Sequence, residues 1–326
     1  CLRLFDREHR LMMSLMTIEE GLREEMGEPE TDHIPVLCKE VVEYLRPQGG
    51  GVFIDCTLGL GGHAQAILQA AGPQSRLIGI DRDAQSLQMA TERLKPYLSQ
   101  CVFVHEDFRN IDKILRRMEI PEVDGILLDL GISSYQLDNP QRGFSFQTDG
   151  PLDMRMDQDS HISAFDLVNS LSEKEISSIL KDYGEERWHN RIARYIIHQR
   201  SHHPIETTQE LSGIVLKAMP PRKTWQRIHP ATRTFQALRI AVNRELESLD
   251  ILLDKCVDLL KAEGRIVVIA FHSLEDRIVK HKFRALAQSG KVKLVFKKPL
   301  RPSEEEAGRN SRARSARLRV VEREPH

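Results

Sequence analysis

The chain has 326 residues, 40% of them hydrophobic and 29% charged, with a formal net charge of −1 at pH 7. This composition is typical of a soluble globular protein with a sizeable core, and the longest apolar runs are too short to span a bilayer. The five cysteines form no Cys-x-x-Cys pair, which argues against structural zinc and against a disulfide framework and favours a reducing compartment. We therefore expect no metal site and no association with a membrane.

Residues 1–30 differ from the rest of the chain because they are acidic and contain no long apolar run. Organellar presequences are instead rich in arginine and poor in acids, and signal peptides have an apolar centre. The stretch begins with Cys1, so we expect either a fragment or an extension upstream of a natural start at Met12, Met13 or Met16. We predict a poorly ordered N-terminal extension.

Between about residues 50 and 131, predicted strands and helices alternate in short units. Strands are predicted at 52–55, 76–81, 101–105 and 124–129, and helices at 64–71, 83–94 and 110–118. Such alternation predicts a parallel, doubly wound sheet with right-handed crossovers.

The alternation breaks at residues 141–160, which are rich in Gly, Pro, Asp and Gln. Only helical segments follow, two of them opened by the capping boxes Ser172-x-x-Glu175 and Thr207-x-x-Glu210. An amphipathic pattern predicts one long helix over 231–262, stopped by Gly264. The remaining predicted elements are a strand at 265–271, a helix capped by Ser273, and strands at 292–296 and 318–321 with a polar loop at 302–315 between them. We predict an α/β domain made of residues 31–136 and 228–326, divided by a mostly helical insertion at 137–227 that recognises the substrate.

The first predicted strand ends in a glycine loop, Asp55-Cys-Thr-Leu-Gly59-Leu-Gly61-Gly62-His63. Doubly wound sheets bind ligands beyond the carboxyl ends of their strands, and glycines let the backbone approach a ligand closely. Asp81 ends the second strand, where it can accept hydrogen bonds from ribose hydroxyls. The spacing Gly59-x-Gly61-x-x-Ala64 also fits a dinucleotide fingerprint, so a nicotinamide oxidoreductase remains an alternative. Asp55 ahead of the glycines, and no evident Tyr-x-x-x-Lys, favour S-adenosylmethionine instead.

The fourth strand ends in Asp129, beside the glycine loop and at the start of the insertion. Methyl transfer to an exocyclic amine needs acceptors that hold the amino hydrogens and turn the lone pair toward the methyl group. The Asp129 carboxylate and the Leu130 carbonyl are suited to this, although Asp129 can also simply cap the strand end. Further candidates for polar contacts, or for stacking on an extruded base, are Ser133, Ser134, Tyr135, Gln136 and Phe144.

Two basic strips are candidates for phosphate contacts. Residues 217–233, which include Lys223 and Arg227, carry five Lys or Arg and no acid, and residues 291–326 carry eleven against five acids. Such strips bind polyanions locally or are merely solvated surface. His272, after the fifth strand, either lines the substrate pocket or caps the next helix.

Taken in order, these motifs resemble the RsmH (MraW) family of small-subunit ribosomal RNA cytosine-N4 methyltransferases. The stretches that carry the resemblance are His33-Ile-Pro-Val36, Asp55 to His63, Asp81-Arg-Asp83, Asp124 to Gly131, Ser133 to Asp138, Arg142-Gly-Phe-Ser-Phe146, Asp149 to Asp157, Tyr183 to Arg187, His229 to Arg239, Phe271 to Lys280 and Asn310 to Ser315. The resemblance implies a class I methyltransferase fold and methyl transfer from S-adenosyl-L-methionine to the N4 amine of a cytidine, with Asp129 as the catalytic residue. The cofactor contacts it implies are Gly61, Gly62, His63, Asp81, Phe108, Asp129 and Gln136.

The resemblance also implies the small ribosomal subunit and its rRNA as partners, with no DNA. It implies a bacterial-type cytoplasmic protein or an organellar form of the same family, as a monomer or a homodimer. The alternatives are the same enzyme class acting on DNA or another RNA, a nicotinamide oxidoreductase, and a catalytically silent ribosome-assembly factor that uses the cofactor as a structural ligand.

Overall fold

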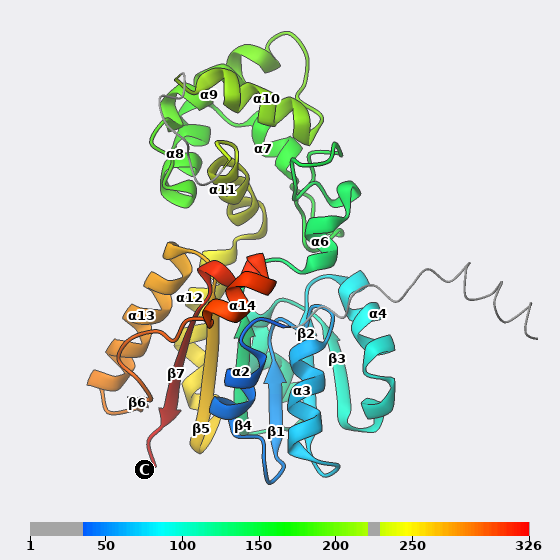
Figure 1. Ribbon diagram of the computed structural model, residues 1–326, viewed down its shortest axis with the longest axis vertical. Coiled ribbons are helices and arrows are strands. Elements are labelled where there is room, and N and C mark those ends of the chain that lie inside the picture. The colour runs from blue at the N-terminus through cyan, green and yellow to red at the C-terminus, as the bar shows by residue number, and fades with distance from the viewer. Residues whose placement is uncertain (1–34, 221–228, 326) are drawn as a thin grey trace, which may run out of the picture. The chain divides into compact units, whose positions relative to one another are not determined.

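A seven-stranded sheet forms the centre of the computed structural model, which describes residues 35–220 and 229–325. Its strands are β1 (Val52–Asp55), β2 (Arg76–Asp81), β3 (Cys101–His105), β4 (Val123–Asp129), β5 (Leu260–Ala270), β6 (Val292–Leu294) and β7 (Arg317–Arg323). Their order is β3-β2-β1-β4-β5-β7-β6, and β1 to β5 pair in parallel (Figure 1). The order reverses between β1 and β4, which is where such sheets bind ligands.

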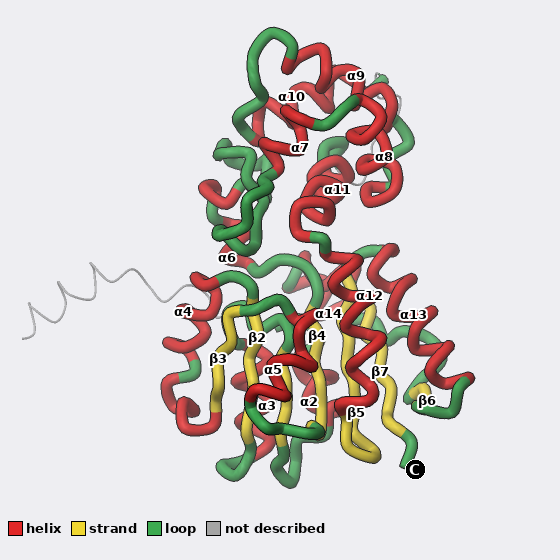
Figure 2. The backbone as a smooth tube through the Cα atoms, turned by 180° about the vertical axis from the view of Figure 1, so that it is seen from behind, coloured by secondary structure: helices red, strands yellow, loops and turns green. Residues whose placement is uncertain are grey.

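Helices cover both faces of the sheet, as doubly wound connections require. One face packs against α2 (Cys38–Leu45), α3 (Gly62–Ala71) and α4 (Ala84–Arg93). The other packs against α5 (Ile111–Arg117), α12 (Glu245–Lys255) and α13 (Ser273–Gln288), of which α5 and α12 lie in front of the strands in Figure 2. Strands buried on both faces explain the continuous apolar runs in β4 and β5.

A separate hydrophobic cluster joins the helices that follow β4 in the sequence. These are α7 (Ala164–Ser170), α8 (Glu173–Gly184), α9 (His189–Arg200), α10 (Thr208–Ala218) and α11 (Thr232–Asn243), called the helical group below. Both predicted capping boxes, at Ser172 and at Thr207, are confirmed. Phe235 and Leu238 of α11 belong to this cluster, so the packing of the helical group continues past residue 228. The predicted domain limits themselves stay a prediction.

The single helix predicted over 231–262 is wrong. The helix breaks at Arg244, whose φ of 50° is left-handed, and α12 then ends at Lys255, before β5 begins at Leu260. Asn243 explains the break, because its side chain donates to the Met154 carbonyl and accepts from the Met156 N–H, both at 2.8 Å. The hydrophobic period continues across this break, so the pattern alone does not reveal it.

The parallel pairing predicted for the strands between residues 50 and 131 is confirmed, and the complete sheet is mixed because β7 runs antiparallel to β5 and β6. Two smaller expectations need correction. The loop predicted at 302–315 contains α14 (Glu304–Arg309) and a 3₁₀ turn at Ser311–Ser315. The N-cap of α13 is His272 rather than Ser273.

Some predictions lie outside the described residues. These are the N-terminal extension at 1–30, and Lys223 and Arg227 of the basic strip. Within the described ranges, no helix combines the length and the apolar character needed to cross a bilayer.

Candidate active site

The glycine loop after β1 is held by the carboxylate of Asp81 at the end of β2. Asp81 Oδ2 accepts from the Gly59 N–H at 2.8 Å, and Asp81 Oδ1 accepts from the Asp83 N–H at 2.9 Å. Burial is the largest influence on the carboxyl of Asp81 and raises its pKa, while these two N–H donors oppose the rise. Gly61 has a φ of 77°, and a Cβ there would meet the Ala90 Cβ at 3.3 Å, so the loop needs glycine at this position.

Three ionisable side chains meet where β1 and β4 end: Asp55, His63 and Asp129. His63 Nε2 lies 3.4 Å from Asp129 Oδ2, an ion-pair separation. Burial alone would lower the pKa of His63, but the Asp129 carboxylate, the Cys38 thiol and Asp55 together raise it to about 10. Burial raises the pKa of Asp55 to about 7, against the opposing charge of His63. His63 is therefore an imidazolium at neutral pH.

One acceptor of this cluster is buried without a hydrogen bond. Among the described residues, Asp129 Oδ1 has no hydrogen-bond partner, while His63 Nε2 faces only the other oxygen, Oδ2, at 3.4 Å. The backbone of Asp129 is nevertheless fixed, because its N–H donates to Thr57 Oγ1 at 2.7 Å. Unpaired buried polar atoms are costly and rare in folded proteins. This edge of the sheet thus presents acceptors and donors suited to a polar ligand.

A buried ion pair between Asp83 and Arg142 lies next to this edge, and sequence reasoning gave neither residue a role in the site. Arg142 Nη1 donates to Asp83 Oδ2 at 2.7 Å, and both side chains are 2% exposed. Gln136 Nε2 donates to the same oxygen at 2.7 Å. The other end of the Arg142 guanidinium donates to the carbonyls of Arg155 and Met156. The available signal was the stretch starting at Arg142, which matches the family, but no local pattern predicts a buried arginine.

The comparisons with known proteins agree with this geometry. The family model described as "MraW methylase family" matches residues 30–324 of this chain. The chain belongs to this family. It is 51% identical over 307 residues to "Ribosomal RNA small subunit methyltransferase H" of Geotalea uraniireducens, covering 89% of this chain and 98% of that one. It is 48% identical over 307 residues to the protein of the same name from Halothermothrix orenii, covering 90% and 98%.

The predicted class I methyltransferase fold is confirmed by the doubly wound sheet and its flanking helices. Among solved structures, an rRNA methylase from Streptococcus thermophilus is 10% identical, with a TM-score of 0.41, covering 88% of this chain and 94% of that chain. That similarity is too distant to add to the family assignment.

Within this MraW methylase, the structure brings most predicted cofactor residues to one edge of the sheet. Gly61, His63, Asp81 and Asp129 meet there, and Gln136 joins them through Asp83. Gly62 is the first residue of α3. Phe108 follows β3, and the Arg82 guanidinium lies 5.7 Å from the centre of its ring.

The predicted substrate residues near α6 (Ser134–Asp138) are engaged locally. The Tyr135 hydroxyl donates to Gln85 Oε1 at 3.2 Å. Arg312 donates to Ser134 Oγ and forms an ion pair with Asp138 at 2.9 Å. Ser133 caps α6 in a capping box with Gln136. Each of these contacts orders the chain, so substrate binding by these side chains stays a prediction.

His272 caps α13 and lies in a polar cluster with two glutamates. Its Nε2 is 3.1 Å from Glu275 Oε1, and no hydrogen bond or ion pair within the described ranges joins it to Asp129. His272, Glu245 and Glu275 place one ligand atom each within 4.8 Å of one another. However, Arg239 binds both carboxylate oxygens of Glu245 at 2.9 Å, and Glu275 Oε2 accepts from the Phe271 N–H. Arg239 and the helix cap account for this cluster without a metal ion.

Proposed function

We propose that this chain transfers a methyl group from S-adenosyl-L-methionine to the N4 amine of a specific cytidine in small-subunit ribosomal RNA. Membership of the MraW methylase family and the printed name of its relatives support the reaction type and the RNA class. The observation that carries the chemistry is the buried Oδ1 atom of Asp129, which has no partner among the described residues. It is an acceptor positioned at the carboxyl end of β4.

The residues at the sheet edge fit the cofactor. S-adenosylmethionine supplies an activated methyl group on a positively charged sulfur. Each oxygen of Asp81 accepts one backbone N–H and keeps a second lone pair, which suits two ribose hydroxyls. The glycine loop lets the backbone approach closely, and Phe108 after β3 offers a ring for the adenine. Gly62, His63 and Gln136 complete the proposed contacts.

Asp129 and His63 have different roles in orienting the amine. The charged imidazole of His63 faces Asp129 Oδ2 and leaves Oδ1 to accept a hydrogen from the cytosine amine. With the Leu130 carbonyl as a second acceptor, both amino hydrogens are held and the nitrogen lone pair turns toward the methyl group. The gain in rate then comes from alignment rather than from a strong base.

The substrate contacts rest on the helical insertion at 137–227 and on its borders. We infer that Lys223 and Arg227 bind phosphates, and that Ser133, Ser134, Tyr135 and His272 line the path to the target base. Small subunits, assembled or assembling in a bacterial-type cytoplasm, are the proposed partner. Methylation of the amine requires the base to leave its stack, which is most easily done where the RNA is single-stranded.

The test is incubation of the protein with S-adenosylmethionine and unmethylated small subunits, followed by mass spectrometry of the nucleosides. We expect N4-methylcytidine, no product on duplex DNA, and calorimetric binding of S-adenosylhomocysteine but not of NADH. Methylation at another atom, or a preference for DNA, would contradict the proposed substrate. Inactivity on every RNA-containing substrate would favour a silent assembly factor.

A further inference from the structure

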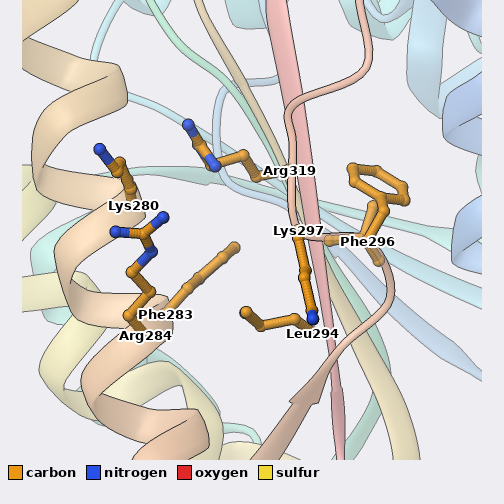
Figure 3. A pocket seen from close by; sticks show the side chains of 8 residues that line it. Lys280, Phe283, Arg284, Leu294, Phe296, Lys297 and Arg319 are labelled. Carbon is orange, nitrogen blue, oxygen red and sulfur yellow. The ribbon is translucent and has the colours of Figure 1, made fainter.

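A shallow basic hollow lies between α13 and the strands β6 and β7, away from the glycine loop. Its cations are Lys280 and Arg284 from α13, Lys297 after β6, and Arg319 from β7. Figure 3 shows the nitrogen ends of Lys280, Arg284 and Arg319 on one side of the hollow and Phe296 on the other. No carboxylate lines it.

The charges at this hollow are uncompensated, unlike those around it. Arg319 binds Asp276 at 2.7 Å, but Lys280, Arg284 and Lys297 form no ion pair or hydrogen bond through their side chains within the described ranges. Neighbouring cations on the same elements are paired: Arg277 with Glu185, Lys282 with Asp250 and Asp254, Lys293 with Glu322, and Arg323 with Glu122. The hollow thus brings three cations without protein partners onto one concave surface.

The hollow lies near the carboxyl edge of the sheet where Asp81, His63 and Asp129 lie, called the active edge below. α13 begins directly after β5 ends, so Lys280, seven residues into the helix, lies about 10 Å from the level of that edge at 1.5 Å per residue. Arg277, Lys280 and Arg284 are three and four residues apart and so share one face of α13. Arg277 contacts Glu185 at the end of α8, so this basic face runs from the helical group down to the hollow.

We propose that this hollow binds backbone phosphates of the RNA substrate, outside the catalytic site, and this rests on the proposed RNA methyltransferase function. Lys280, Arg284 and Lys297 supply charges for phosphodiester oxygens, and the buried Phe283 and Val320 give the hollow a rigid apolar floor. Phosphate contacts fix the position of RNA without reading its sequence. The hollow would thus hold a flanking segment of the RNA while the target cytidine occupies the active edge.

The decisive variant is Lys280→Gln/Arg284→Gln/Lys297→Gln. We expect its affinity for protein-free small-subunit RNA to fall about 10-fold or more at 0.1 M salt, and the slope of log Kd against log salt to decrease by about two. The affinity for S-adenosylhomocysteine should not change, and the loss should appear as a higher KM for RNA. Because these side chains have no partners to lose, the melting temperature should also stay the same.

Two controls separate this proposal from a general effect of charge. Arg76, Lys113 and Arg116 are exposed and have no side-chain partner within the described ranges, so replacing all three with Gln removes the same charge elsewhere and should leave RNA affinity within about 2-fold. The Lys280→Arg/Lys297→Arg variant keeps the charges and should bind RNA like the wild type. Equal RNA affinity and salt slope in the wild type and the Gln variant, with normal methylation by the wild type, would overturn the hollow alone. Absence of RNA binding by the wild type would overturn both proposals.

Discussion

The carboxyl edge of the sheet has a buried acceptor that no described protein group uses, whereas the side chains that tie the sheet to the helical group are bonded to protein at both ends. Asp129 Oδ1 has no hydrogen-bond partner among the described residues, and His63 Nε2 faces Asp129 Oδ2 as an ion pair at 3.4 Å; in the tie, Arg142 Nε is the atom left without a partner. Arg142 joins Asp83 to two carbonyls of the loop at 155–156, and Asn243 holds the same loop. If the first arrangement binds cofactor and substrate as proposed and the second maintains the structure, substitutions in the two regions should affect different measurements.

The largest expected effect is on stability, at the Arg142–Asp83 pair. Arg142→Met leaves the Asp83 carboxylate buried without its cation, which costs about 3–5 kcal/mol. Arg309→Met is the control, because its pair with Glu305 is largely exposed and such pairs contribute at most about 1 kcal/mol. Chemical denaturation measures both.

A second variant sharpens the Arg142 result. Adding Asp83→Asn to Arg142→Met removes the stranded charge and keeps an acceptor for the Gln85 N–H at the start of α4, so the double variant should be more stable than Arg142→Met alone. A double variant that is no more stable would show that the ion pair is not the tie between the two regions.

Asp129 should affect turnover most, although its replacement also leaves the buried His63 without the carboxylate that it faces. If its free oxygen orients the amine, Asp129→Ala lowers turnover at saturating cofactor at least about 100-fold, or about 2.7 kcal/mol of transition-state stabilisation. Asp129→Asn keeps an acceptor oxygen but removes the charge facing His63, and should lose less. Methylation of isolated small subunits is the measurement, and near-normal turnover of Asp129→Ala would remove this residue from the mechanism.

The contrast between the two regions also explains which contacts could be predicted from the sequence and which could not. Asp81, His63 and Asp129 stand in local motifs at strand ends, and parallel strands bring such ends together by rule, so this edge was predictable. The pairing of Asp83 with Arg142 joins residues 59 positions apart that no periodicity relates. The break at Arg244 was equally hidden, because neither Gly nor Pro marks it and the tie from Asn243 to the 154–156 loop is tertiary.

The charged cluster at the active edge makes stability depend on pH. The pKa of His63 is raised from 6.5 to about 10, so the native state binds more protons than the unfolded state between these values. The stability that protonated His63 contributes to the native state is complete below pH 6.5 and is lost as the pH rises toward 10. The free energy of unfolding should therefore fall by up to about 1.4 kcal/mol between pH 7 and pH 8.

Asp55 also lowers the free energy of unfolding as the pH rises, but over a lower pH range. Its pKa is raised from 3.8 to about 7, so its contribution is complete below pH 3.8 and is lost by about pH 7. His63→Gln alone also removes the charge that lowers the pKa of Asp55, which moves the loss due to Asp55 to higher pH. The double variant His63→Gln/Asp55→Asn should therefore be the one that flattens the curve above pH 7. The same alkaline slope in the double variant and in the wild type would assign the effect to other groups.

The smallest expected effect tests the link between the regions, at the break between α11 and α12. Arg244 adopts a φ of 50°, which is unfavourable for a residue with a Cβ and favourable for glycine. Arg244→Gly relieves this strain but removes the ion pair with Glu247, which is largely exposed and contributes little. Arg244→Ala removes the same ion pair and keeps the strain. The Arg244→Gly variant should thus be more stable than the Arg244→Ala variant by about 1 kcal/mol in thermal or chemical unfolding, although glycine is the poorer residue in a helix.

The opposite order of stability would contradict this account. If Arg244→Ala were the more stable variant, residues 231–255 would favour the continuous helix that their hydrophobic pattern predicts, and the left-handed turn would have to be maintained by Asn243 alone. An Asn243→Ala variant would then lose the break, which spectroscopic helix content would register as an increase.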